Sequence, residues 1–298
     1  MHGVVNLDKP VGPTSHDMVG LLRRLTSIRR IGHAGTLDPL ASGVLPILVG
    51  AATRFSAELT GGAKRYDATI RLGARSATDD AEGPIEAVDA RLPDEAAVRG
   101  ALAAMTGTFL QRPPAFSARK LGGRVAHRAA RAGEALELAP RAVTIYALDV
   151  RSVDRGEGWL DVVVDVRCGT GTYVRSIARD LGEQLGTGGY LRALRRTEAA
   201  GLSVGTAITP ERLADLEADG HLEEAILPVG PLLTLPRVLL GEAAAWRFLH
   251  GSAQPLEVGE AGGARVAVFE GERLLGIGAV DGGVLSPEKV VPIETPVS

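Results

Sequence analysis

The sequence predicts an α+β protein with a mixed sheet, followed by a small C-terminal β domain. Strand-like and helix-like segments follow one another without the regular strand–helix alternation of a doubly wound sheet. A proline-rich stretch, LPVGPLLTLP, predicts a domain boundary near residue 230. Beyond it, short alternating stretches are separated by turn signals at GE and DGG, which is typical of a small β module.

The N-terminal segments predict two strands and one helix around a loop. GVVNLDKP is typical of a short strand, and Pro10 ends it. SHDMVGLLRRL then shows helical spacing of its apolar residues, with Thr14 or Ser15 as the expected cap. The glycines and proline of SIRRIGHAGTLDPLAS are typical of a loop. The apolar GVLPILVG that follows is typical of a buried strand.

The middle of the chain predicts further strands and amphipathic helices. KRYDATIRLG alternates like a half-buried strand, and ARSATDDAEGPIEAV is a polar, turn-rich connection. DEAAVRGALAAMTG has helical periodicity, with Gly107 as its expected stop. WLDVVVDVRCG is typical of a strand, GTYVRSIARDLGEQLG of a helix that ends near Gly186, and 191–197 of another strand. The acidic TPERLADLEADGHLEEAI predicts one or two short helices.

Composition indicates a globular protein of the cytoplasm. The 298 residues are 45% apolar and 23% charged, and the longest apolar runs fall far short of the roughly 18 residues that a membrane helix needs. The first residues, MHGVVNLDKP, lack the charged start and apolar core of a signal peptide. The single cysteine, Cys168, excludes an internal disulfide, fits a reducing compartment and is expected to be a small buried residue.

The distribution of charge favours contact with phosphates more than the total does. The net charge is −3, but residues 1–196 hold 27 Lys and Arg against 21 Asp and Glu, and residues 197–298 hold 6 against 15. Between 111 and 133 there are six basic residues and no acidic one. A nucleic-acid backbone would be attracted to such patches. The alternative is that these residues form solvated helix faces.

Several kinds of site are excluded by missing motifs. GTGTYVR lacks the Gly-Lys-Ser/Thr ending of a phosphate loop, and no GxGxxG follows a strand. The six histidines show no metal-ligand spacing, so we expect no metal. Asp79 and Asp80 are adjacent and are expected to point to different sides, which makes them a poor catalytic pair. A two-carboxylate hydrolase would need a second acid near Asp38, and none is obvious.

Asp38 is the most distinctive acidic residue, because it lies in the glycine-rich loop GHAGTLDPLASGVL. Gly32, Gly35 and Gly43 permit tight turns or close approach of a ligand to the backbone. Pro39 restricts Asp38 to extended or turn conformations. The pattern therefore predicts a rigid loop that presents one carboxylate at the start of a buried strand. The alternative is an aspartate that only satisfies its own backbone in an Asx-turn.

Two further residues at the edges of predicted strands are candidates for a binding or catalytic site. Tyr66 follows Lys64 and Arg65, and an aromatic ring among basic residues can stack on a base while phosphates are held. Arg175 follows a glycine-rich strand-to-helix turn and could project toward a cleft. The alternatives are a tyrosine that packs across the sheet and an arginine that is merely solvated.

Six segments together resemble one family. They are DKPVGPTSHD, GHAGTLDPLASGVLPILVGAATRF, KRYDATIRLG, RPPAFSARKLGGRVAHRAARAG, CGTGTYVRSIARDLG and LRALRRTEAAG. In this order, over residues 3 to about 205, they are similar to the bacterial tRNA pseudouridine synthase family TruB. The element G-x-LDP-x-A-x-G-x-L is highly specific, and six elements in sequence make coincidence improbable.

The resemblance implies a fold, an activity and partners. It implies a pseudouridine synthase fold over 1–229, with a largely antiparallel central sheet flanked by helices and loops, and a PUA-like β-barrel over 230–298. It implies isomerisation of uridine 55 in the tRNA T-loop to pseudouridine without cofactor or metal. The T-arm of tRNA is the implied partner. No protein partner, no membrane and a monomer are expected, because nothing in the sequence demands more.

The resemblance also implies the roles of individual residues. Asp38 is then the nucleophile, Arg175 pairs with it, and Tyr66 stacks on the flipped uracil and assists proton removal from C5. Tyr173 and Leu194 line the base pocket, and His33 fills the space that the flipped base leaves. The insertion at about 111–145, whose acid-free part is 111–133, closes over the RNA. The expected phosphate contacts are Lys9, Arg29, Arg30, Arg119 and Lys120.

Three alternatives to this activity stay open at the level of sequence. The same patches could bind and refold tRNA without turnover. A nucleosidase or glycosidase would release free uracil and would need a second essential carboxylate. Related synthases that act on other RNAs share the aspartate-containing loop, so the loop alone does not fix the RNA. The net charge of −3 over 230–298 predicts a small electrostatic contribution of this domain to RNA binding.

Overall fold

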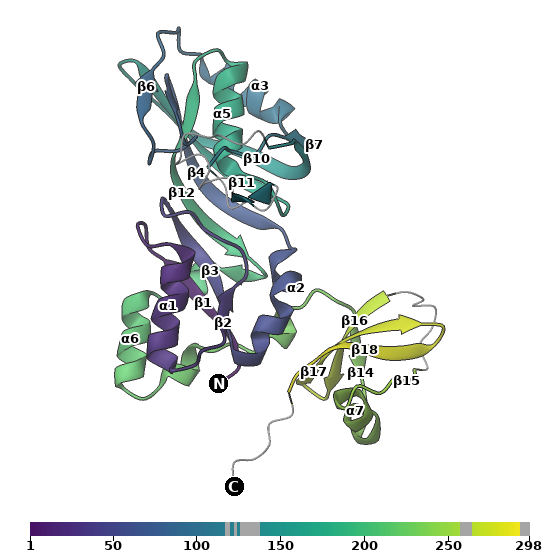
Figure 1. Cartoon of the computed structure of the whole chain (residues 1–298). Coiled ribbons are helices and arrows are strands. Elements are labelled where there is room, and N and C mark those ends of the chain that lie inside the picture. Colours follow the sequence, from purple (N-terminus) through teal and green to yellow (C-terminus); the bar gives the residue numbers. More distant parts are fainter. Residues whose placement is uncertain (117–119, 122–123, 126–137, 257–263, 293–298) are drawn as a thin grey trace.

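A computed structural model gives the architecture of the chain (Figure 1). It describes residues 1–116, 138–256 and 264–292, and between 117 and 137 only the course of the short strands β8 (Lys120–Leu121) and β9 (Arg124–Val125). Most of the predicted RNA-binding insertion, including the side chains of Arg119 and Lys120, therefore lies outside the described residues.

One long mixed sheet organises the larger part of the molecule and confirms the predicted α+β class. Its path is β1-β3-β12-β4-β11-β10-β7, and β2 and β13 pair at its side to make nine strands. Every pairing is antiparallel except that of β3 with β12. The strands are β1 Gly3–Lys9, β2 Ile31–His33, β3 Ala41–Val49, β4 Lys64–Leu72, β7 Gly107–Gln111, β10 Arg141–Gly156, β11 Trp159–Cys168, β12 Gly189–Ala199 and β13 Leu202–Ser203.

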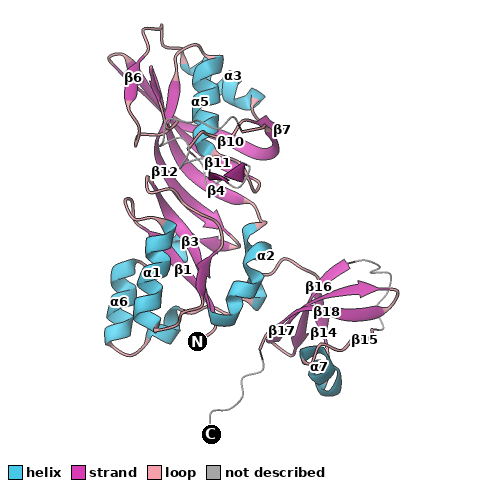
Figure 2. Ribbon diagram, viewed as in Figure 1, coloured by secondary structure: helices cyan, strands magenta, loops and turns pink. Residues whose placement is uncertain are grey.

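Helices cover this sheet at its two ends (Figure 2). α1 and α6 contact each other at one end, and α3 and α5 contact each other at the other end. Within the described residues no helix is long and apolar enough to cross a bilayer. In the part of the chain that the structure describes, the α-helices are α1 Ser15–Thr26, α2 Ser56–Thr60, α3 Glu95–Ala104, α5 Val174–Gln184, α6 Pro210–Ala218 and α7 Glu242–Leu249.

Of the two residues predicted to cap the first helix, Thr14 and Ser15, it is Thr14 that does so. Its hydroxyl accepts from the backbone N–H of Asp17, and the Asp17 carboxylate accepts from the backbone N–H of Thr14, which forms a complete capping box. Met18, Val19 and Leu22 are the apolar residues that this helix buries. Leu21 and Leu25 are only partly buried, so the buried face is narrower than the pattern predicts.

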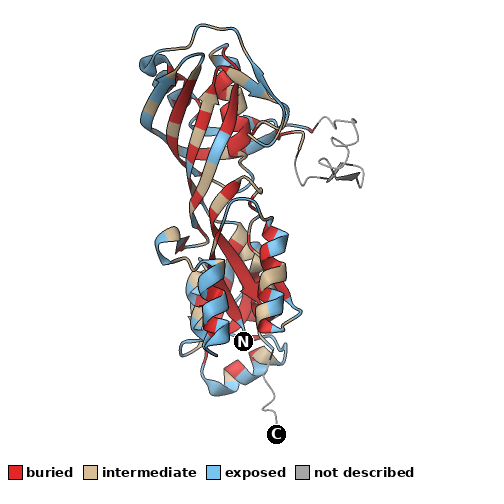
Figure 3. Cartoon of the chain, turned by 90° about the vertical axis from the view of Figure 1, so that its left-hand side faces the viewer, coloured by how far each residue is buried: buried red, intermediate tan, exposed pale blue. Residues whose placement is uncertain are grey.

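Buried apolar residues follow the strands of the sheet (Figure 3), on both faces of β1 and β3 and on one face of β4 and β11. The opposite side of β4 and β11 carries charged residues instead. There Arg65 pairs with Asp165 and Arg71 pairs with Asp161, each through two hydrogen bonds. The alternation in KRYDATIRLG thus separates an apolar face from a face of ion pairs, as its half-buried pattern predicts.

The C-terminal residues form a second sheet with the order β14-β16-β17-β18-β15, which confirms the predicted β module. Its strands are β14 Arg237–Leu239, β15 Gln254–Pro255, β16 Ala264–Glu270, β17 Arg273–Asp281 and β18 Val284–Val290. One helix, α7, packs against this sheet, which the sequence reasoning missed. Glu58 of α2 binds both Arg265 and Lys289 of the module and joins it to the larger part. The boundary at 229/230 stays a prediction.

Several strands were not anticipated, and three of them, each at least three residues long, belong to the large sheet. β2 lies inside the segment predicted as a loop, and β7 follows directly where helix α3 was expected to stop. The third, β10, is the longest strand of the sheet. In the polar connection after β4, residues 74–76 and 85–87 also pair as a short hairpin, β5 Ala74–Ser76 with β6 Ile85–Ala87.

Candidate active site

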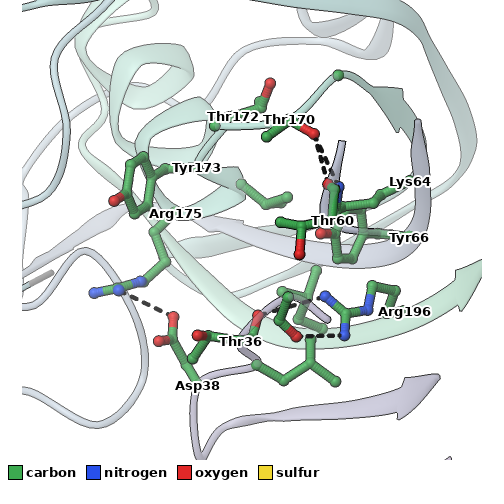
Figure 4. Close-up of a pocket in the computed structure, with 16 residues that line it drawn as sticks. Thr36, Asp38, Thr60, Lys64, Tyr66, Thr170, Thr172, Tyr173, Arg175 and Arg196 are labelled. Atoms are coloured by element: carbon green, nitrogen blue, oxygen red, sulfur yellow. Dashed lines mark hydrogen bonds and ion pairs between the residues drawn. The ribbon is translucent and has the colours of Figure 1, made fainter. Parts of the chain in front are cut away.

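A cavity of about 360 Å³ opens where β4, β12, the Asp38 loop and the start of α5 meet. Figure 4 shows Asp38 and Arg175 facing each other on one side of it and Tyr66, Lys64 and Arg196 on the other. Its volume is in the range of sites for small organic groups. Five of the residues predicted for the site line it, namely Asp38, Tyr66, Tyr173, Arg175 and Leu194.

The loop that carries Asp38 is fixed by its neighbours on both sides. Upstream, the Ser15 hydroxyl both donates to the Leu37 carbonyl and accepts from the Leu37 N–H, at 3.0 and 2.8 Å. Downstream, the Pro39 carbonyl accepts from the backbone N–H of Gly12 at 2.9 Å. These contacts hold the backbone around Asp38 while its side chain stays 41% exposed. The structure confirms that the loop presents the Asp38 carboxylate at the start of β3, and these hydrogen bonds agree with the predicted rigidity.

Arg196 of β12 holds the same loop from inside the molecule. This arginine is buried, and its guanidinium donates to the carbonyls of Gly35, Thr36 and Val44. The close approach explains the glycine at 43, which has a φ of +100° and where a Cβ would come within 2.1 Å of the Arg196 carbonyl. The sequence reasoning missed Arg196 as a site residue, and only its adjacency to Leu194 in LRALRRTEAAG could have pointed to it.

Arg175 and Asp38 form the ion pair at the centre of the site. The Arg175 Nη2 lies 2.9 Å from Asp38 Oδ2, and the arginine side chain is 7% exposed. Its other acceptors are the backbone carbonyls of Thr78 and Phe116, at 3.1 and 2.9 Å. A buried guanidinium with its donors satisfied in this way has one orientation, and it orients the carboxylate that it binds.

Asp80 also reaches Arg175, which the sequence reasoning missed. Its Oδ2 lies 3.4 Å from Arg175 Nη1, and its other carboxylate oxygen accepts from the Thr78 hydroxyl and from the Glu82 N–H at 3.0 Å. Asp79, its neighbour, turns the other way and pairs with Arg179 at 3.0 Å. The prediction that the two carboxylates diverge is confirmed, but Asp80 belongs to the site through Arg175.

Lys9 is not placed as the sequence reasoning expected. A phosphate contact would need an exposed ammonium, whereas Lys9 is fully buried and its Nζ donates to the carbonyls of Pro10 and Pro13, both at 2.8 Å. A third carbonyl, that of Pro39, lies at 3.5 Å and immediately follows Asp38. The expected phosphate contact of Lys9 is therefore wrong for this geometry, and Lys9 instead ties the turn after β1 to the Asp38 loop.

We predict that the stability supplied by Lys9 increases with pH. Burial lowers the pKa of Lys9 from 10.5 to about 8, while nearby Asp38 raises it in part. Between these two values the unfolded chain binds more protons at this site than the folded chain, so the contribution of Lys9 to the free energy of unfolding rises with pH. Urea unfolding of wild type and Lys9→Met at pH 7.5 and 9.5 tests this. A difference between the two proteins that stays constant with pH contradicts it.

Tyr66 and Leu194 form the floor of the cavity from neighbouring strands. Tyr66 of β4 pairs in register with Arg196 of β12, and Leu194 pairs with Ala68, so both side chains emerge on the pocket-facing side. Burial raises the pKa of the Tyr66 phenol, although Arg196 partly offsets this rise. The hydroxyl is therefore protonated at neutral pH, and the ring presents an apolar face beside a cation.

Lys64, Thr170 and Tyr173 line the rim on the side of the glycine-rich turn. The Lys64 Nζ donates to the Thr170 hydroxyl at 3.1 Å and to the carbonyls of Thr60 and Gly62 at 2.8 and 2.9 Å. Burial lowers the pKa of Lys64. Together with Arg175 and Arg196 it makes the lining of the cavity more cationic than anionic, which suits a polyanionic ligand.

His33 lies on β2, beside the cavity and not in its lining. Its ring is partly buried, and the buried Nδ1 atom has no hydrogen-bond partner within the described residues. Burial and the nearby Arg196 lower the pKa of His33, which favours the neutral ring. Two basic residues of the insertion that were expected to contact phosphates, Arg119 and Lys120, have side chains outside the described residues.

Three family models match consecutive parts of the chain. Residues 23–174 match the TruB family pseudouridylate synthase (N terminal domain). Residues 175–234 match the tRNA pseudouridylate synthase B C-terminal domain, and residues 236–291 match pseudouridine synthase II TruB, C-terminal. The change of model at 234–236 falls close to the start of β14.

Curated relatives and solved structures resemble the chain over nearly its whole length. The tRNA pseudouridine synthase B of Burkholderia lata is 45% identical over 98% of this chain and 90% of its own, and that of Ralstonia nicotianae is 42% identical over 98% and 94%. An H/ACA RNP bound to a substrate RNA containing 2′-deoxyuridine includes a chain that superposes with a TM-score of 0.76 at 26% identity, covering 98% of this chain and 85% of that one.

A Cbf5-Nop10-Gar1 complex includes a chain that superposes with a TM-score of 0.74 at 30% identity, over 97% of this chain and 85% of that one. These matches and the geometry above agree with the predicted pseudouridine synthase fold with a PUA-like C-terminal module. The chain therefore belongs to the TruB family of pseudouridylate synthases.

Proposed function

We propose that this chain isomerises uridine 55 in the T-loop of tRNA to pseudouridine. The observation that supports this proposal most strongly is the half-exposed Asp38, held by the buried Arg175 at the mouth of a cationic cavity. The curated relatives are named tRNA pseudouridine synthase B, which supports tRNA as the substrate. The choice of the T-loop and of position 55 rests on the whole set of shared motifs.

The reaction conserves every atom of the substrate. The bond between ribose C1′ and uracil N1 breaks, the uracil turns within the site, and a bond forms between C1′ and C5. The proton leaves C5 and N1 gains one, so the mass of the RNA does not change. One carboxylate suffices for this sequence, because the leaving base is also the group that returns. We assign that carboxylate to Asp38.

Arg175 is the partner that holds Asp38 in one orientation. The pair lies in a site partly shielded from water, where a charged hydrogen bond of 2.9 Å is stronger than at an open surface. Asp80 on the far side balances the guanidinium and limits the directions it can take. The Asp38 oxygen that Arg175 does not bind is the one available to the substrate.

Tyr66, Leu194 and Tyr173 are proposed to hold the uracil. The Tyr66 ring is the stacking surface, and Leu194 and Tyr173 line the cavity around the base. We propose that Tyr66 also assists removal of the C5 proton. Burial raises the pKa of its phenol, so the hydroxyl acts as a relay that passes its own proton on while it accepts the one from C5.

Binding requires that the target base leave its loop, which costs a few kcal/mol. We propose that His33, whose ring is partly buried on β2, enters the space left behind. Arg119 and Lys120 are the proposed phosphate contacts. We further propose that the protein works as a monomer in the cytoplasm without a partner protein.

Mapping of pseudouridine on an unmodified tRNA transcript incubated with the purified protein tests the proposal. The expected result is one pseudouridine at position 55 and no free uracil. Release of uracil, with a fall in RNA mass, would indicate hydrolysis instead. Binding of the transcript without any pseudouridine would favour an RNA-folding protein.

Asp80→Asn is expected to slow the reaction about 10- to 100-fold, because Arg175 loses one of the charges that orient it and the pair with Asp38 loosens. Pseudouridine formation measured in single turnover, with enzyme in excess, reports this step. Asp79→Asn is the matched control, since it changes the adjacent carboxylate that faces Arg179. Equal rates for the two variants would show that Asp80 does not contribute to the reaction through Arg175.

A further inference from the structure

The strand β7 ends in a glutamine whose side chain binds the backbone of a cavity residue. The Gln111 Nε2 donates to the Tyr173 carbonyl at 3.1 Å, and the Tyr173 N–H donates to Gln111 Oε1 at 2.9 Å. The primary amide thus pairs with both backbone groups of one residue, across 62 positions of sequence. Gln111 is 2% exposed, so water does not compete for either bond.

This amide supports the start of a helix that has no side-chain cap. Tyr173 is the N-cap of α5, and no side chain of that turn caps the helix. The first N–H groups of a helix have no partner within the helix and need one from elsewhere. Gln111 supplies an acceptor to the N–H of Tyr173 itself, and it does so from strand β7 of the sheet. Arg175 lies in the turn that this contact fixes.

The backbone that follows Gln111 makes further contacts with the same helix. The Arg112 carbonyl accepts from the Ser176 hydroxyl and from Arg179 Nη2, both at 2.9 Å. The Phe116 carbonyl accepts from Arg175 Nη2, the atom that also binds Asp38. Among the described residues from Gln111 to Phe116, only the Gln111 side chain donates a hydrogen bond to the backbone at the start of α5. Gln111 therefore helps to fix the position of this segment against the helix.

We propose that Gln111 is a positioning residue for the active site, which acts through Tyr173 and the start of α5 to place Arg175 against Asp38. This role rests on the proposed function, because it concerns the geometry of that reaction. Nothing requires Gln111 to touch the substrate. Its two hydrogen bonds fix the backbone of Tyr173, which lines the cavity. They also fix the start of α5, from which the Arg175 side chain extends.

The substitution Gln111→Glu tests the role through pH. A carboxylate at this position still accepts from the Tyr173 N–H but repels the Tyr173 carbonyl, whereas a carboxylic acid restores both bonds. Burial raises the pKa of such a carboxyl, so the acid form returns in an accessible range of pH. We expect the single-turnover rate relative to wild type to be about 10- to 100-fold lower at pH 8, the scale of a small misplacement, and to recover toward pH 5.5.

Two other variants separate positioning from packing. Gln111→Met loses both bonds at every pH and is expected to stay slow without recovery, with tRNA affinity near that of wild type. Gln254→Glu is the matched control, because Gln254 is also buried and also donates to a backbone carbonyl, that of Ala244, within the C-terminal module. It is expected to react at the wild-type rate at both pH values.

A rate ratio for Gln111→Glu that does not change with pH, or a wild-type rate for Gln111→Met, overturns the role. Thermal melting at each pH shows whether the variants are folded, and a loss of rate that follows only a loss of folded protein also counts against it. Absence of pseudouridine with wild type would instead overturn the proposed function, so the two failures are distinguishable.

Discussion

Asp38→Ala is expected to abolish pseudouridine formation, with a fall of at least about 10⁴-fold in the single-turnover rate, the scale on which loss of a nucleophile acts. The fold should tolerate the change. The carboxylate is 41% exposed, and the loop is held by Ser15, Gly12 and Arg196 through backbone groups that alanine keeps. Binding of tRNA should persist, because other residues provide the cationic surface.

The measurement is pseudouridine content after long incubation with excess enzyme, together with the tRNA dissociation constant. Asp67→Ala is the matched control: Asp67 has a similar exposure of 49%, but it lies on the opposite side of β4 and faces Arg151. It should react like wild type. Pseudouridine made by purified Asp38→Ala would show that another group is the nucleophile, and loss of tRNA binding would show that Asp38 serves affinity.

Features fixed by neighbouring residues were the ones that the sequence could predict. The helix cap at Thr14 or Ser15, the buried strand after the Asp38 loop and the presented Asp38 carboxylate follow from turn chemistry and apolar periodicity over a few positions. β2 and β7 were not predicted, because strands of three and five residues show too little alternation of apolar and polar residues. They form only because β3 and β10 pair with them.

Features that depend on contacts far apart in the sequence could not be read from local patterns. Asp80 and Arg196 meet the site from positions that look like a turn and a strand. The expected phosphate contact of Lys9 was wrong for a related reason. The family resemblance suggested a phosphate contact for Lys9, and only the folded chain shows that three carbonyls converge on its ammonium. The roles of Asp38, Arg175 and Tyr66 came from the family resemblance and remain predictions.

Arg175→Lys is expected to lower the single-turnover rate about 10²- to 10³-fold, although the positive charge is kept. The guanidinium of Arg175 reaches two carboxylates, on Asp38 and Asp80, and two backbone carbonyls, and its planar fork fixes all four directions at once. An ammonium has three donors on a flexible stem and cannot reach the same set. Asp38 should then lose its orientation more than its charge.

The rate of pseudouridine formation and the tRNA dissociation constant, measured on the same preparations, test this expectation. Arg71→Lys is the matched control, because Arg71 also binds a carboxylate, that of Asp161, through two hydrogen bonds but on the far side of the sheet. It should change the rate less than about threefold, as expected for a partly exposed pair away from the chemistry. If Arg175→Lys reacts as fast as Arg71→Lys, charge alone at this position suffices. The geometry of the fork would then play no part in catalysis.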